Sequence, residues 1–445
     1  MLPDLIRRYS APVPRYTSYP TAPQFSPTIG PRVYETWLRA LPAGSNLSLY
    51  LHFPFCHQLC WYCGCNTKAI RRYEPVEAYV AALLREIAHV SELAGPHHRV
   101  THVHWGGGSP NILAPEDIAR VGAALQKAFN LAPDAEYAVE IDPRTLSDEQ
   151  VAAFAAIGVN RVSLGVQDFD EQVQQAINRI QSFEDTKRAV DMFRAHGVRS
   201  INLDFVYGLP HQTRKSVQKT ILKALALDPD RIAIFGYAHL PSRLKHQRLI
   251  EDKALPGIME RFGQSRRLHR ILLAAGYKAV GLDHYAKPSD KLADEEVRRN
   301  FQGYTTDASD ALIGLGASAI GHLPQGYVQN ATAAGIYQAM VEGGRLPTVK
   351  GIKLSADDRV RAAVIERLMC GFDLSKSALR DEFGADAEAV IADAELLIEA
   401  DQDGLVKPTE DGFEVTDFGK PFVRTICAAF DAYLGQSKAQ HALAV

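Results

Sequence analysis

The feature that most limits the fold of this chain is a regular alternation of strand-like and helix-like segments after residue 46. The predicted strands are residues 47–53, 100–105, 137–141, 161–166, 200–206 and 231–235. The predicted helices are residues 76–93, 115–129, 147–157, 183–196, 213–227 and 257–275. Because parallel strands are joined by crossover helices, this order predicts an α/β fold with a partial, TIM-like (β/α)6 barrel. Ser147 and Gln150 have the spacing of a helix capping box.

The segments on either side of this region have different patterns. Residues 1–40 are expected to form an N-terminal arm, because residues 13–20 are rich in proline, tyrosine and hydroxyl groups and lack helix or strand periodicity. The arm either wraps the surface of the core or acts as a lid that brings Arg15 and tyrosines to a ligand. Residues 41–350 are expected to form the barrel and an extension, with a short strand at 277–282 and a stretch of small residues at 312–320.

Residues 351–445 are expected to form a small, mostly helical C-terminal domain of winged-helix type. The predicted helices are residues 357–369, 376–383, 385–400 and 416–434, with a two-stranded segment between 404 and 415. No basic stripe accompanies these helices, so a packing role is favoured over DNA binding.

Composition and charge exclude several classes of protein. The formal net charge is −3, which gives no general attraction to nucleic acid. No run reaches the ~18 apolar residues that span a bilayer, and the first eight residues have no signal-peptide core. We therefore expect a cytoplasmic protein without a membrane span. No coiled-coil seam is visible, which favours a monomer.

Four of the six cysteines lie within ten residues, directly after the first predicted strand. Cys56, Cys60 and Cys63 have the spacing Cys-x3-Cys-x2-Cys, and three thiolates at this spacing can ligate three irons of one iron–sulfur cube. The distant Cys370 and Cys427 lie in apolar, helical patterns and are expected to be small buried side chains. One iron would therefore lack a cysteine and be open to a small molecule.

Two other interpretations of the cysteines are weaker. A structural zinc site usually adds a second pair of cysteines or histidines downstream, and no such pair is visible. A disulfide framework requires a secretory context, which the sequence lacks.

Polar or glycine residues follow several of the predicted strands. Residues 106–108 are a glycine triplet, which suits either a tight turn or the close approach of a ligand. Glu140, Gln167, Arg179 and Asp204 lie after or near successive strands. Each alone is typical of a residue that caps a strand end. Together, at the carboxyl edge of one barrel, they suit a polar, zwitterionic ligand with a ribose.

The cysteine spacing resembles the cluster loop of radical S-adenosylmethionine (SAM) enzymes. Longer stretches resemble one family among them, the oxygen-independent coproporphyrinogen III oxidases. These stretches are residues 14–20, 63–66, 104–110, 165–169, 207–210, 237–241 and 300–306. The similarity runs nearly from end to end, so it implies a radical SAM barrel for the predicted (β/α)6 unit.

The resemblance also implies roles for individual residues. Cys56, Cys60 and Cys63 would ligate a [4Fe–4S] cluster, whose open iron would hold the amino and carboxylate groups of SAM. The residues expected to line this SAM or a neighbouring molecule are Gly107, Gly108, Glu140, Gln167, Arg179 and Asp204. A second SAM is expected beside the first. The positions associated with the two nucleotides are Tyr50, Tyr62, Gly107, Ala238 and Ile320.

Two positions depart from the family pattern. Tyr62 stands where phenylalanine is frequent, and Ser109 replaces a usual threonine in the SAM-binding segment while keeping the hydroxyl. Cys65 matches the family's extra cysteine; it is not expected to bind iron and is the candidate catalytic residue.

The reaction implied is an anaerobic oxidative decarboxylation in haem and porphyrin biosynthesis. A radical derived from SAM removes a hydrogen from the β-carbon of a propionate, and loss of carbon dioxide and one electron leaves a vinyl group. Two such events convert coproporphyrinogen III to protoporphyrinogen IX. The partners are this substrate, an electron donor and an electron acceptor, the last two unidentified. Arg15 is the candidate for binding a propionate.

Two relatives in the same superfamily are the alternatives. A haem chaperone usually has an aromatic residue in place of the last cysteine, so Cys65 and the arm at residues 14–20 argue against it. A radical SAM haem methyltransferase shares the cluster, but the arm and residues 300–306 favour the oxidase.

Overall fold

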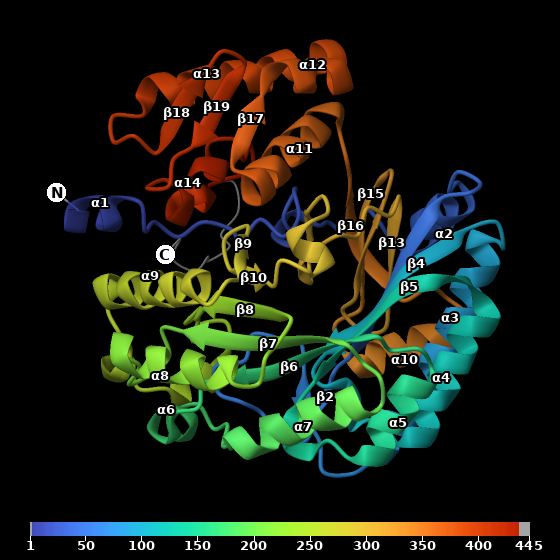
Figure 1. Cartoon of the computed structure of the whole chain (residues 1–445). Helices are drawn as coiled ribbons and strands as arrows, with labels where there is room; N and C mark the ends of the chain where they lie inside the picture. The colour runs from blue at the N-terminus through green and yellow to red at the C-terminus, as the bar shows by residue number, and fades with distance from the viewer. Residues whose placement is uncertain (1, 436–445) are drawn as a thin grey trace.

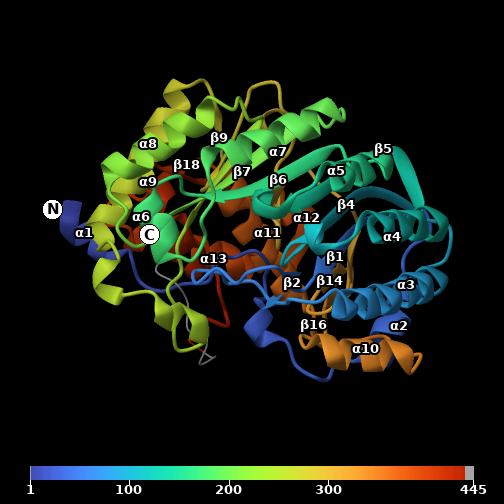
Figure 2. The ribbon, with the colours of Figure 1, turned by 90° about the horizontal axis from the view of Figure 1, so that it is seen from below.

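The computed structural model describes residues 2–435 of the 445-residue chain. Its centre is a curved sheet whose parallel strands follow one another in chain order (Figures 1 and 2). These strands are β1 (Asn46–Phe53), β4 (Arg99–Gly107), β5 (Asn130–Ile141), β6 (Arg161–Gln167), β7 (Ser200–Tyr207) and β8 (Arg231–Gly236). The predicted partial (β/α)6 barrel is therefore confirmed.

The crossover helices cover the outer side of this sheet (Figure 2). They are α3 (Glu74–Ala94), α4 (Pro115–Ala128), α5 (Asp148–Ala156), α7 (Phe183–Ala195) and α8 (Arg214–Leu225), followed by α9 (Ile258–Ala274). The capping box of Ser147 and Gln150 is present at the start of α5. Trp105 on β4 is fully buried between sheet and helices, where its ring lies 6.0 Å from that of Phe154 on α5. Burial of such side chains against the sheet stabilises the helices that carry them.

The sheet extends beyond the barrel at both edges, giving twelve strands in all. β13 (Ala311–Leu315) pairs in parallel with β1, and β14 (Ile320–Leu323), β15 (Gly326–Asn330) and β16 (Thr348–Lys353) continue antiparallel. At the other edge β10 (His284–Ala286) and β9 (Lys278–Val280) add to β8.

β13 was not predicted, because residues 312–320 have the pattern of a small-residue stretch and not that of a strand. Glycine is required there, because a Cβ on Gly314 would lie 2.7 Å from the backbone of Ile320. The close approach of two strands thus requires glycine, which is depleted in strands. Residue propensities therefore do not predict a strand here.

The N-terminal arm packs on the C-terminal domain with its first half and on the barrel and its extension with its second half. It contains two helices that were not predicted, α1 (Leu2–Arg8) and α2 (Pro31–Arg39), whereas residues 13–20 form neither helix nor strand. Ile6, Tyr16 and Tyr19 are buried in one apolar cluster with C-terminal residues. In Figure 1 the arm passes between the C-terminal domain and the barrel.

The C-terminal domain combines helices with a small antiparallel sheet. Its elements are α11 (Ala356–Gly371), β17 (Asp373–Ser375), α12 (Lys376–Phe383), α13 (Glu388–Ala400), β18 (Val406–Thr409), β19 (Gly412–Val415) and α14 (Val423–Ala428). The helix predicted over 416–434 was wrong in extent, because α14 has six residues. The chain packs against β18 before α14 begins: a Cβ on Gly419 would lie 2.1 Å from the carbonyl oxygen of Leu405. Residues 436–445 of the predicted domain lie outside the described part.

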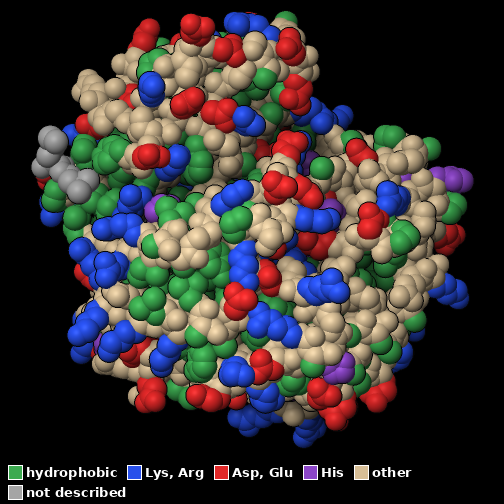
Figure 3. Space-filling model, in the orientation of Figure 1, with side chains coloured by type: hydrophobic (Ala, Val, Ile, Leu, Met, Phe, Trp, Pro, Cys, Tyr) green, Lys and Arg blue, Asp and Glu red, His purple; other side chains and the backbone are tan. Residues whose placement is uncertain are grey.

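Between residues 2 and 435 no helix is long and apolar enough to cross a membrane. On the face drawn in Figure 3, acidic and basic side chains are interspersed, in keeping with the small net charge.

A buried carboxylate connects the barrel to its extension. Glu86 on α3 is 2% exposed and accepts hydrogen bonds from the Tyr337 hydroxyl (2.6 Å), the Gly316 N–H (2.7 Å) and the Asn330 amide (2.7 Å). Burial raises the pKa of Glu86 to about 7, although these three donors oppose the shift. A group whose pKa is raised on folding stabilises the fold below its unfolded pKa, and this stabilisation is lost as the pH rises through the folded pKa.

We therefore expect Glu86→Gln, which cannot ionise, to change the pH dependence of stability. From about pH 4.5 to above pH 7 the free energy of unfolding of the wild type should fall by roughly 3 kcal/mol relative to that of the variant. Urea unfolding at a series of pH values measures this difference. A difference that stays constant with pH would contradict the assigned shift.

Candidate active site

A cavity of about 570 Å³, here called the main cavity, lies over the carboxyl ends of the parallel strands. Its volume is within the usual range for small-molecule sites, and its position is the one that barrel enzymes use. The strand-end residues that line it are Gly107, Gly108, Glu140, Ile141, Asp142, Gly165, Gln167, Asp204, Val206, Phe235, Gly236, Tyr237 and Ala238.

The cysteine loop, residues 56–65, is held against this edge by backbone hydrogen bonds. The Gly108 N–H donates to Phe53 O (2.8 Å) and the Ser109 N–H donates to Phe55 O (2.9 Å). The short parallel strands β2 (Phe55–Cys56) and β3 (Lys68–Ala69) close the base of the loop. Only glycine fits at residue 108, because a Cβ would lie 2.4 Å from Phe55 O. Gly108, the last residue of the glycine triplet, therefore positions the loop that carries the cysteines.

All four cysteines of this loop line the main cavity. Cys60 Sγ lies 3.6 Å from an Arg144 nitrogen and 3.5 Å from an Arg179 nitrogen. A hydrogen bond from Cys65 lowers the pKa of the Cys63 thiol to about 7, although burial opposes this. Burial raises the pKa of the Cys56 thiol to about 12, so that thiol loses its proton only when a metal compensates for the charge.

These residues fit an iron–sulfur cube. Three thiols on one short loop face a cavity with room beyond them, and two guanidinium groups beside Cys60 offset the negative charge of bound thiolates. In the described part of the chain no three His, Cys, Asp or Glu side chains converge on a single metal ion. A cube does not require such convergence, because each cysteine ligates a different iron.

Two carboxylates, on strands β5 and β7 at either side of β6, have opposite tendencies to ionise. Glu140 Oε1 lies 2.9 Å from His104 Nε2, and the Gly107 N–H donates to Glu140 Oε2 (3.4 Å). Burial raises the pKa of Glu140, but these two partners outweigh it and lower the pKa overall. Burial raises the pKa of Asp204, which accepts a hydrogen bond from Ser163 (2.6 Å). The cavity therefore offers an ionised acceptor at Glu140, suited to an ammonium or hydroxyl group of a ligand.

Arg179 and Asp142 line the main cavity near Cys60. Asp142 pairs with Arg144 (2.6 Å) and Arg179 (3.4 Å); burial opposes ionisation, yet the two guanidiniums lower its pKa to about 2. Arg179 Nε is buried without a hydrogen-bond partner in the described chain. Asp142 and Arg144 were not predicted as site residues. The signal was present, since both follow directly after the end of β5.

The structure brings most of the predicted site residues together. Those that line the main cavity are Arg15, Cys56, Cys60, Tyr62, Cys63, Cys65, Gly107, Gly108, Glu140, Gln167, Arg179, Asp204 and Ala238. Three others lie outside its lining. Tyr50 is inside β1, where its hydroxyl lies 3.0 Å from His52 Nδ1. Ser109 is buried beside Asn111 and the Asp142 backbone, and Ile320 packs beside Phe25 and Tyr327.

A three-cysteine loop at the open end of a partial parallel barrel defines a radical SAM type of site, and comparisons with known proteins agree. Residues 50–224 match the model of the radical SAM superfamily, and residues 354–422 match that of the HemN C-terminal domain.

Relatives match over nearly the whole chain. The chain is 50% identical to the oxygen-independent coproporphyrinogen III oxidase of Bradyrhizobium diazoefficiens, over 97% of each chain. It is 44% identical to that of Paracoccus denitrificans, over 96% of this chain and 95% of the relative. The solved structure of coproporphyrinogen III oxidase (HemN) from Escherichia coli, a radical SAM enzyme, is 38% identical in sequence, with a TM-score of 0.89 over 94% of this chain and 97% of that one. The chain belongs to the oxygen-independent coproporphyrinogen III oxidase family.

The position of the cysteine loop can be tested with two glycines that both line the main cavity. Gly108→Ala should destabilise the protein by about 1–3 kcal/mol and reduce the iron it retains, because the new methyl group overlaps Phe55 O. Gly64→Ala, inside the loop itself, meets nothing within 4 Å and should behave like the wild type. Thermal unfolding and iron analysis after gel filtration measure both effects. Equal behaviour of the two variants would contradict this role of Gly108.

Proposed function

We propose that this chain catalyses the oxygen-independent conversion of coproporphyrinogen III to protoporphyrinogen IX. Two propionates become vinyl groups, each by giving a hydrogen atom to a SAM-derived radical and then losing carbon dioxide and one electron, which an electron acceptor takes up. The observation that carries the proposal is the three-cysteine loop facing the main cavity, in a chain that matches oxidases of this name along nearly its whole length.

We assign Cys56, Cys60 and Cys63 as ligands of a [4Fe–4S] cluster. When bound, the reduced cluster and SAM together supply the radical that removes a hydrogen from the propionate β-carbon. The residues of the chain bind and orient the ligands. Gly107 and Gly108 line the main cavity beside the ligand, and the ionised Glu140 accepts hydrogen bonds from the ligand.

We further propose that two SAM molecules bind side by side. Gln167, Arg179 and Asp204 would contact the first, whereas Tyr62 and Ala238 would contact the nucleotides. Three of the predicted residues lie outside the lining of the main cavity: Tyr50, Ser109 and Ile320. They would influence SAM binding only by positioning the residues beside them. Cys65 is our candidate catalytic residue, because its thiol borders the main cavity and is not needed for iron.

The three predicted parts of the chain have separate tasks in this proposal. The barrel and its extension, residues 41–350, carry the chemistry, whereas the arm (1–40) and the C-terminal domain (351–445) close the site against water. We propose a monomer in the cytoplasm, where a reducing environment keeps the cluster ligands as thiols.

Iron analysis tests the ligand assignment. Anaerobically reconstituted wild type should contain about four irons per chain and should form product with SAM and a reductant. Cys56→Ser should lose most of the iron and all product formation. Cys370→Ser, a matched control on α11 outside the main cavity, should keep both. A Cys56→Ser protein with a full cluster and full activity would overturn the assignment.

The role of Cys65 requires a separate variant. Cys65→Ser should retain the iron content of the wild type but lose most product formation, because its sulfur borders the main cavity without ligating iron. Spectroscopy of the cluster and product analysis are measured on the same sample. Unchanged activity would remove the catalytic assignment of Cys65.

A further inference from the structure

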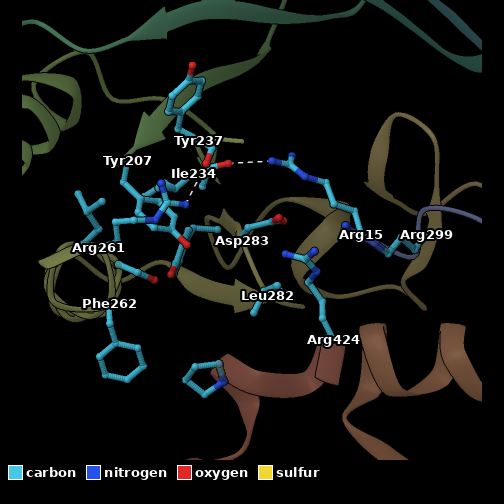
Figure 4. Close-up of a pocket in the computed structure, with 15 residues that line it drawn as sticks. Arg15, Tyr207, Ile234, Tyr237, Arg261, Phe262, Leu282, Asp283, Arg299 and Arg424 are labelled. Carbon is cyan, nitrogen blue, oxygen red and sulfur yellow. Dashed lines mark hydrogen bonds between the residues drawn. The ribbon is translucent and has the colours of Figure 1, made fainter. Parts of the chain in front are cut away.

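A second, smaller cavity of about 60 Å³ lies beside the main cavity. We call it the arginine cavity, because Arg15, Arg261, Arg299 and Arg424 all line it (Figure 4). Arg15, Gly236 and Tyr237 line both cavities, so the two are neighbours across the end of β8. The space is large enough for a group of a few atoms and too small for a ring system.

The four arginines come from four separate parts of the chain. Arg15 belongs to the arm, Arg261 to α9, Arg299 to β11 (Arg298–Asn300) and Arg424 to α14. Arg15 donates to Gly236 O (2.7 Å) and Arg261 donates to Tyr237 O (2.9 Å). Arg424 donates to the backbone oxygens of Val13 and Pro14, which holds the arm in place beside the cavity.

The arginine cavity has a clear excess of positive charge. Its one carboxylate is Asp283, which pairs with His284 at 2.7 Å. Burial raises the pKa of Asp283, but the hydrogen bond from His284 and the charges of Arg299 and Arg15 lower it overall. Four guanidiniums against one carboxylate leave an excess of three charges. Within residues 2–435 no carboxylate oxygen lies within 4.0 Å of a side-chain nitrogen of Arg15, Arg261 or Arg299.

Arg299 in particular lacks an acceptor. Its Nε and one terminal nitrogen are buried with no hydrogen-bond partner in the described chain, and its guanidinium lies 4.3 Å from the centre of the Tyr304 ring. Leaving such charged donors unpaired is costly, and a carboxylate is the group whose geometry matches a guanidinium best.

We infer that the arginine cavity binds a propionate carboxylate that the reaction leaves in place. This inference rests on the proposed function. Loss of carbon dioxide removes the negative charge of a carboxylate, so several guanidiniums around it stabilise the starting state more than the transition state. A carboxylate held here is therefore protected from decarboxylation. The reacting propionate belongs in the main cavity, next to the cysteine loop.

Binding of stable porphyrins tests the inference without turnover. Coproporphyrin III has four propionates, protoporphyrin IX has only the two that the reaction retains, and coproporphyrin tetramethyl ester has no free carboxylate. Equilibrium dialysis with the reconstituted full-length protein gives an affinity for each. Arg299→Gln should weaken binding of both free acids by the same factor, about tenfold or more, as expected for one lost charged hydrogen bond. It should leave ester binding unchanged.

Two further variants serve as controls. Arg299→Lys keeps the charge and should lose less affinity than Arg299→Gln. Arg298→Gln changes the neighbouring arginine, which pairs with Glu296 at 2.9 Å outside the arginine cavity, and should match the wild type. Iron content shows that each variant is folded and loaded.

The outcomes separate the inference from the proposed function. Weaker binding of coproporphyrin alone would mean that the arginine cavity holds a reacting propionate, and unchanged binding of both acids would mean that it holds none; either result overturns the inference while the proposed function stands. A wild-type protein that binds neither porphyrin would count against both.

Discussion

The site depends on one backbone contact, between the end of β4 and the start of the cysteine loop. Gly108 and Ser109 donate hydrogen bonds to the strand-end carbonyls of Phe53 and Phe55, and the absence of a side chain at residue 108 lets the two segments touch. This contact requires β1 and β4 to be adjacent and parallel. The pairing register of β1 and β4 therefore determines how the three thiols are placed relative to the carboxylates at the strand ends.

Charge divides the open end of the barrel into two regions. Beside the cysteine loop, Arg144 and Arg179 share the carboxylate of Asp142, which leaves an excess of one positive charge. Across β8, three of the four arginines of the arginine cavity form no such pair in the described chain. A substrate with several carboxylates can then be oriented by the more positive arginine cavity while its reacting end lies in the less positive region beside the cysteine loop.

Much of the barrel and its edge could be predicted from the sequence, because both depend on local patterns. The six strands and the helices between them follow from apolar periodicity, and strand ends meet at one edge in any parallel sheet. β13 was missed because a close contact demands glycine there. The arginine cavity was missed because its members are separated by up to about 400 residues and meet only through the packing of the arm between two domains.

The central claim is that the cysteine loop and the main cavity together direct removal of a hydrogen from a propionate β-carbon. The most direct measurement uses coproporphyrinogen III deuterated at those carbons, incubated anaerobically with the reconstituted protein, SAM and a reductant. The account predicts deuterium in the 5′-deoxyadenosine that is released, together with protoporphyrinogen IX. Formation of 5′-deoxyadenosine without deuterium, or binding of haem without any vinyl product, would contradict it.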